Sequence, residues 1–200
     1  VTASRAPFDP VNVPHGKQDW YIDVGGLWQD VTLTAVPLTY IEAAHITTHI
    51  HTGDVRVRVR LAGAAASLNT GEVAVTVGDV TVTAALAAGQ PEYDVALTVK
   101  SPAWWSPDQP TLYTAVVRLT APGTDDTISV RFGFREISTR DGQLLLNGEP
   151  LYLLSALDQD YYPETIYTVP SEAYLRDEFA KAKALGFNNL RCHIKPPDPL

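Results

Sequence analysis

The chain has 200 residues, 45% hydrophobic and 19% charged, a composition typical of a globular protein that excludes extended disorder. Acidic residues outnumber basic ones 23 to 15, and the net charge of −8 argues against nucleic-acid binding, which needs a clustered basic surface. Apolar runs are too short for a membrane span and no signal peptide is visible, so we expect a soluble protein, cytoplasmic or secreted, with no membrane partner.

The first 36 residues cannot form a core alone. Prolines at positions 7, 10 and 14 and the pair Gly25-Gly26 interrupt regular structure, which leaves Trp20–Ile22 and Val31–Thr34 as short predicted strands. The chain has a single cysteine, Cys192, and so has no internal disulfide. It also lacks methionine, which fits a segment of something longer.

Residues 37–138 alternate between apolar and polar positions almost throughout. Val55, Val57 and Val59 share one face of a strand, for example, and a Gly78-Asp79 turn joins two more strands. About seven strands in roughly 100 residues predict an immunoglobulin-like antiparallel β-sandwich.

The segment Trp105–Tyr113 predicts a rigid corner within this region. Pro107 and Pro110 fix their own φ angles and lack an N–H, so the segment cannot join a strand ladder. The alternating strand 112–119 follows. The simplest interpretation is a structural corner, in which Trp105 packs rather than binds a ligand.

The last part, residues 139–200, changes period. An Asn147-Gly148 turn precedes a predicted strand at 151–154, a helix from about Ser171 to Leu185, and a second strand at 187–194. Strand, helix and strand in this order predict one βαβ unit with parallel strands, which cannot stand alone because its faces and edges would be bare.

Four motifs in order carry a family resemblance: Trp105–Tyr113, then Phe132–Arg135, Leu146–Pro150 and Asn188–Arg191. Together with Gly25–Val31 they resemble glycoside hydrolase family 2, the β-galactosidase, β-glucuronidase and β-mannosidase group. The resemblance implies a jelly-roll remnant at 1–36, the sandwich at 37–138, and the start of a (β/α)₈ barrel at 139–200.

The resemblance also implies a retaining β-glycosidase that acts through two glutamates and a covalent intermediate. In the family those glutamates lie on later barrel strands, so we expect no catalytic residue in this chain, no metal, no cofactor and no activity of the chain by itself. The partner would be a carbohydrate substrate, bound by the complete parent enzyme. Homo-oligomerisation stays open.

What remains would be one edge of a sugar pocket at the carboxyl ends of the first two barrel strands. The residues implied at the first end are Asp158, Gln159 and Asp160, where β-galactosidases typically have a histidine-rich stretch, so galactosidase specificity is not indicated. At the second end, Arg191 could orient an active-site carboxylate and His193 could bind sugar. A solvated polar loop, or a structural histidine, remains the alternative.

Other features are discounted as sites. Three histidines at 45, 49 and 51 favour a solvated strand face over a zinc site, and the arginines at 56, 58 and 60 favour an exposed sheet face over a glycan-binding stripe. A carboxylate pair of Asp158 with Asp160 or Glu164 has no family match, and Cys192 is predicted to be a small buried filler.

Two hypotheses of different classes follow. The first is a segment of a retaining β-glycosidase in which the sandwich is a spacer. The second is a non-catalytic carbohydrate-binding or adhesion module in which the sandwich works alone.

Overall fold

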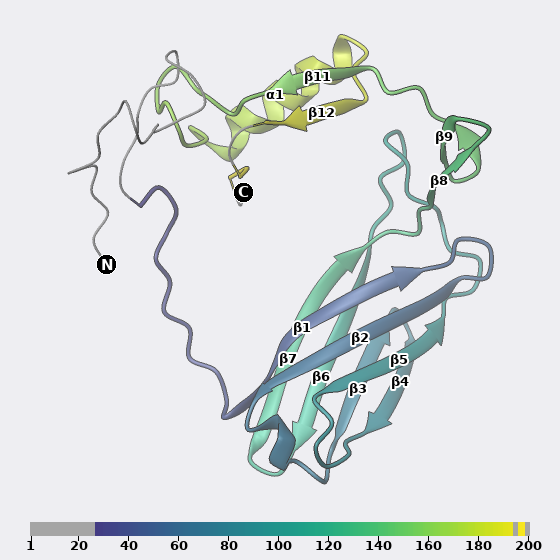
Figure 1. Ribbon diagram of the computed structural model, residues 1–200, viewed down its shortest axis with the longest axis vertical. Helices are drawn as coiled ribbons and strands as arrows, with labels where there is room; N and C mark the ends of the chain where they lie inside the picture. The colour runs from purple at the N-terminus through teal and green to yellow at the C-terminus, as the bar shows by residue number, and fades with distance from the viewer. Residues whose placement is uncertain (1–26, 194–195, 199–200) are drawn as a thin grey trace. The chain divides into compact units, whose positions relative to one another are not determined.

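A computed structural model describes residues 27–193 and 196–198 (Figure 1). The predicted strand Trp20–Ile22 and the prolines before it lie outside the described residues. The described chain divides into two compact units. One is Thr34–Tyr152, and the other combines the described part of Val1–Leu33 with Leu153–Leu200.

The larger unit contains seven long strands, as predicted. They are β1 (Thr39–Thr48), β2 (Asp54–Gly63), β3 (Glu72–Val77), β4 (Val80–Ala85), β5 (Glu92–Thr98), β6 (Tyr113–Ala121) and β7 (Thr124–Phe132), with a 3₁₀ turn, Ala65–Ser67, after β2. Figure 1 shows them as two layers, one ordered β1-β2-β5 and the other β4-β3-β6-β7, and every pairing is antiparallel.

The core lies between these layers because one face of each strand is apolar. Along β2 the burial alternates strictly, so that its valines are buried and its arginines are exposed. Val57 of one sheet and Val75 and Val117 of the other have no exposed surface, and neither has Phe134, which follows β7. Period-two patterning therefore places the core where the sequence predicts it.

The corner at 105–112 is a fixed segment outside the strand ladders, and Tyr113 already begins β6. A turn closes it, in which the Ser106 amide donates to the Gln109 carbonyl (2.9 Å) and the Gln109 amide donates back to the Ser106 hydroxyl (3.0 Å). Trp105 is half-buried, and a Cβ placed on Gly133 would lie 3.0 Å from the Trp105 Cβ. Trp105 therefore packs against Gly133, as predicted, and that it binds no ligand stays a prediction.

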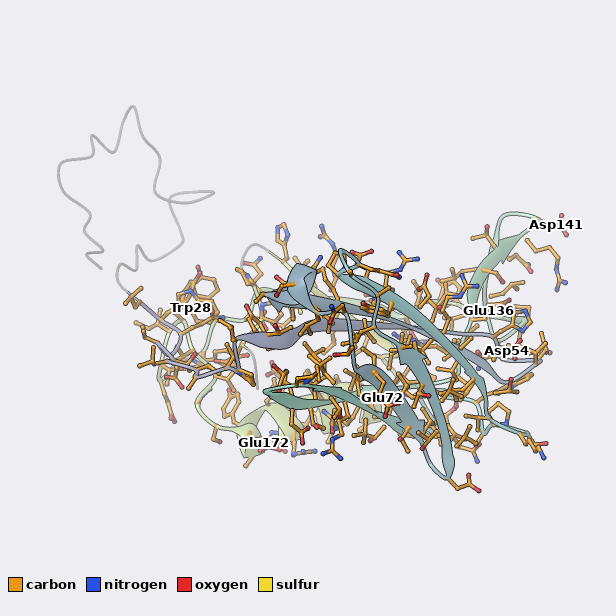
Figure 2. All side chains as sticks on the ribbon, turned by 90° about the horizontal axis from the view of Figure 1, so that it is seen from below. Trp28, Asp54, Glu72, Glu136, Asp141 and Glu172 are labelled. Atoms are coloured by element: carbon orange, nitrogen blue, oxygen red, sulfur yellow. The ribbon has the colours of Figure 1, made fainter. Side chains whose placement is uncertain are left out.

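A small three-stranded sheet follows the sandwich, made of β8 (Ile137–Arg140), β9 (Gln143–Leu146) and β10 (Glu149–Pro150). Figure 2 labels Glu136 and Asp141, the residues on either side of β8. Asn147 in the second turn joins this sheet to the corner: its Nδ2 donates to the Trp105 carbonyl (3.0 Å), and its Oδ1 accepts from the Glu136 amide (2.9 Å).

The smaller unit contains a strand, a helix and a second strand. These are β11 (Ser155–Asp158), α1 (Glu172–Ala184) and β12 (Asn189–Cys192), and the two strands pair in parallel. The Ser171 hydroxyl caps the helix by accepting from the Tyr174 amide (3.1 Å), and Gly186 follows its end at φ +89°. The predicted βαβ unit is therefore present.

Two predicted strands are wrong. Val31–Thr34 pairs with no strand of the described chain and is exposed, because apolar alternation alone supplies no partner. The strand predicted at 151–154 begins only at Ser155. The Leu151 amide instead donates to the Leu144 carbonyl, and the Leu154 amide donates to the Asn188 side chain (2.9 Å). Between residues 27 and 193, no helix is both long and apolar enough to cross a membrane.

Candidate functional site

The parallel pair brings together the two strand ends at which sugar-binding residues are predicted. Asp158 is opposite Cys192 in the register, and the His193 amide donates to the Asp158 carbonyl (2.8 Å). Residues 35 positions apart in sequence thus meet at one sheet end. Whether they bind sugar stays a prediction.

The register also assigns these residues to different faces of the pair. Arg191 is opposite Leu157, and both are exposed on one face. Asp158 and Cys192 share the other face. The carboxylate of Glu178, on α1, interacts electrostatically with Asp158, so α1 lies on the Asp158 side. Arg191 therefore lies on the face away from the helix.

The turn after β11 is shaped by the first predicted site residue. The Asp158 Oδ1 accepts from the Asp160 amide (2.8 Å), and Asp160 has a left-handed backbone, with φ at +55°. Aspartate tolerates this conformation better than most residues. Asp160 is only 7% exposed and Gln159 is half-buried, so this part of the chain is not a fully solvated loop.

Acidic groups beneath this turn perturb one another. Partial burial, and then the nearby charges of Asp158 and Asp160, raise the pKa of Glu178 above its usual range. Burial is also the main cause of a raised pKa at Tyr162, with further contributions from Asp160 and Glu178. The phenol stays protonated, and Glu178 holds its proton to a higher pH than a solvated glutamate does.

Several aromatic rings contact one another near the turn that follows β11. Tyr161 meets the ring of Tyr167 edge-to-face at 5.8 Å, and Trp28 meets the same ring at 5.1 Å. Tyr162 contacts Tyr174 of α1 at 5.7 Å. Sequence analysis did not place Trp28, Tyr167, Tyr174 or Glu178 in this region, because their approach depends on tertiary folding. The only available signal was the Trp28 motif.

The features discounted as sites fall where expected, with two exceptions. The arginines of β2 are exposed and two of them form surface ion pairs, Arg58 with Asp94 (3.3 Å) and Arg60 with Glu42 (2.6 Å). Only His45 lies on a strand; the histidines at 49 and 51 are in the following turn with ring centroids 6.0 Å apart. In the described part of the chain, no group of three or more His, Cys, Asp or Glu residues could hold a metal.

The second exception is Cys192. The prediction of a buried filler is wrong, because the cysteine is exposed. Its side chain does lie on the strand face opposite Arg191, as the alternation predicts. The prediction of burial was wrong because a side chain is buried only where other apolar side chains cover its face of the strand.

The sandwich matches a known protein family. The family model described as "Glycosyl hydrolases family 2" matches residues 39–135, which form the sandwich, so this part of the chain is similar to that family. The resemblance seen in the motifs is confirmed.

A β-galactosidase from Enterobacter cloacae is 29% identical over 196 residues, covering 88% of this chain and 19% of that protein. A family 2 β-galacturonidase from Eisenbergiella tayi, bound to galacturonate, has a TM-score of 0.69 at 25% identity, covering 82% of this chain and 30% of the other. β-Glucuronidase 3 of Bacteroides uniformis has a TM-score of 0.70 at 23% identity, with 90% and 23% covered. The chain thus spans less than a third of each.

Proposed function

We propose that this chain is a segment of a retaining β-glycosidase that hydrolyses O-glycosidic bonds in carbohydrates. The observation that carries the proposal is the parallel β11–β12 pair, joined through α1, which follows a sandwich that matches family 2 after the small β8–β10 sheet. The names of the relatives, a β-galactosidase, a β-galacturonidase and a β-glucuronidase, support glycoside hydrolysis as the reaction class.

The proposed organisation has three parts. Residues 1–36 would end a jelly-roll sugar-binding domain, 37–138 would form an immunoglobulin-like spacer, and 139–200 would begin a (β/α)₈ barrel. The immunoglobulin-like assignment of 37–138 is supported by its two sheets, with three strands in one and four in the other.

The apolar surface of the smaller unit supports the barrel assignment. Leu157 of β11 is 53% exposed, Phe179 of α1 is 45% exposed, and no helix residue is fully buried. Parallel strands in proteins are normally covered on both faces, so these positions suit contact with further strands and helices.

In such a barrel Asp158, Gln159, Asp160, Arg191 and His193 would form one edge of the sugar pocket, with Asp158 acting through the turn that its side chain holds. Arg191 is the strongest candidate to hold a catalytic carboxylate, because a guanidinium offers paired donors that match a carboxylate. The two glutamates, about 5–5.5 Å apart in retaining enzymes, would lie outside this chain, so the chain alone should not turn over substrate.

The experiment compares the purified chain with its full-length parent on aryl β-galactoside, β-glucuronide and β-mannoside. We expect turnover by the parent only. In the parent, Arg191→Lys should lower kcat/KM by about tenfold or more because it removes the planar donor pair. The control Arg176→Lys changes an exposed arginine of α1 that pairs with Glu172 and should leave activity unchanged.

Turnover by the chain alone would contradict the proposal that its catalytic groups lie elsewhere. A parent that binds sugars without hydrolysing any of the three substrates would instead favour the carbohydrate-binding or adhesion module. An equal loss of kcat/KM in Arg176→Lys and Arg191→Lys would contradict a specific role for Arg191.

A further inference from the structure

A cleft of about 510 Å³ opens between the two sheets of the larger unit, at the edge where β1 and β7 are neighbours. Residues of both edge strands line it, together with the Trp105 corner. The volume is within the range of small-molecule sites, about 300–1,000 Å³. The lining residues that matter here are Thr47, Thr48, Trp105, Leu112, Arg131 and Arg135.

The lining is cationic although the chain is acidic. Arg131 and Arg135 both line the cleft, and among the described residues neither forms an ion pair. Arg58 and Arg118 of this unit pair with carboxylates, whereas Arg56 and Arg140, which lie outside the cleft lining, also form no ion pair among the described residues. In a chain with a net charge of −8, two unneutralised guanidiniums in one cleft favour an anionic ligand.

One of these guanidiniums is held in place. The Arg135 Cζ lies 4.9 Å from the centroid of the Trp105 ring, a cation–π contact. Trp105 is itself fixed, because its amide donates to the Phe134 carbonyl (2.8 Å) and its carbonyl accepts from Asn147 (3.0 Å). A side chain held in this way loses less rotamer entropy when a ligand binds.

The other lining groups suit a hydroxylated ring. The Thr48 hydroxyl offers an acceptor at the cleft and donates to the Gly133 carbonyl (3.4 Å). Leu112, which is 51% exposed, gives an apolar wall for ring C–H groups. Charged donors, hydroxyls and a small apolar surface together match a sugar acid better than a bare inorganic anion.

An extended peptide fits this edge less well. Strand addition needs a continuous row of free backbone groups. The register of β1 shifts between Ile41 and Ala43, and the Ile41 amide donates to the Asp126 carboxylate (2.7 Å). At the other end of the β1 edge, the Gly133 carbonyl already accepts a hydrogen bond from the Thr48 hydroxyl. A compact ligand is therefore favoured.

We propose that this cleft binds a carboxylate-bearing monosaccharide through Arg131 and Arg135. The inference concerns the 34–152 unit and does not depend on the hydrolytic reaction proposed above. The test titrates the full chain with D-galacturonate, D-galactose and acetate and follows backbone amide NMR shifts. Galacturonate and galactose differ only at C6, so the pair isolates the carboxylate.

We expect galacturonate to shift the Thr47 and Gly133 amides, and galactose and acetate to bind at least about tenfold more weakly. Arg131→Ala and Arg135→Ala should each raise the Kd about tenfold, the scale of a charge-assisted hydrogen bond. Arg135→Lys keeps a cation near Trp105. If this variant binds more tightly than Arg135→Ala, the loss of affinity in the alanine variant is not caused by unfolding. Arg140→Ala, a change of equal charge outside the cleft lining, should leave the Kd unchanged.

Absence of galacturonate binding would overturn the proposal. So would shifts confined to other residues, equal binding of galactose, or wild-type affinity in both arginine-to-alanine variants. Acetate binding as tightly as galacturonate would overturn the assignment of a sugar ligand.

Discussion

Asn147 should contribute more to stability than an ordinary turn residue, because it joins the β9–β10 turn to the Trp105 corner. Its side chain makes two hydrogen bonds, to the Trp105 carbonyl and from the Glu136 amide, and its φ is +53°. Replacement by alanine removes both bonds, at about 1 kcal/mol each, and puts a residue that tolerates positive φ less well than asparagine at this position, at about 1 kcal/mol more. The expected loss is about 3 kcal/mol.

The chain offers a matched control in the neighbouring turn. Asp141 has nearly the same backbone, with φ at +50°, and a glycine follows it as Gly148 follows Asn147. It is exposed, so Asp141→Ala should cost only the backbone term, about 1 kcal/mol. The difference of about 2 kcal/mol between the two variants isolates the side-chain bonds.

Urea unfolding followed by tryptophan fluorescence measures both losses, and amide hydrogen exchange at Glu136 localises the effect. Asn147→Ala should speed exchange at Glu136, whereas Asn147→Asp keeps the acceptor and should preserve protection there. Equal destabilisation by Asn147→Ala and Asp141→Ala would refute the reasoning. Unchanged exchange at Glu136 in Asn147→Ala would refute it as well.

Three further predictions concern the core, the acidic cluster and the cysteine. Phe134→Ala should cost about 3–5 kcal/mol in urea unfolding, since Phe134 is fully buried, whereas Val116→Ala on the exposed side of β6 should cost less than about 1; similar losses would contradict the assigned core. Because the folded state raises the pKa of Glu178, stability should fall as pH rises from the ordinary value of 4.5 through the raised one. Glu178→Gln should therefore increase the melting temperature at pH 7 and leave it unchanged below pH 4, with Asp177→Asn showing no such gain. Cys192 should react with a thiol reagent in native buffer, and reaction only after denaturation would show that it is buried.

The sandwich could be predicted from sequence because its signal is local. Alternation along a strand decides which side chains face the core, and β2 and β5 show it without interruption. The same signal failed at 151–154, where an apolar run has its amides taken by Leu144 and by the Asn188 side chain. Whether a segment forms a strand also depends on the neighbouring chain with which it can pair, and the sequence of the segment alone does not identify that neighbour.

The sequence could predict which residues lie at the candidate site, but not which side chains surround them. The meeting of Asp158 with His193 follows from a parallel pair, which the strand-helix-strand order indicates. The effect of Glu178 on this end, and the Trp28 ring on Tyr167, depend on tertiary packing. The exposure of Cys192 likewise depends on what covers the strand.

The register of β11 and β12 places the predicted sugar-binding residues Asp158 and Arg191 on different faces of the pair. Arg191 shares a face with Leu157, away from α1, and in a (β/α)₈ barrel the helices are outside, so that face would point inward. Asp158 lies on the helix side and its Oδ1 holds the turn at Asp160. Within the proposed barrel, Arg191 would therefore reach the substrate region directly. Asp158 would act through the turn, by fixing where Gln159 lies.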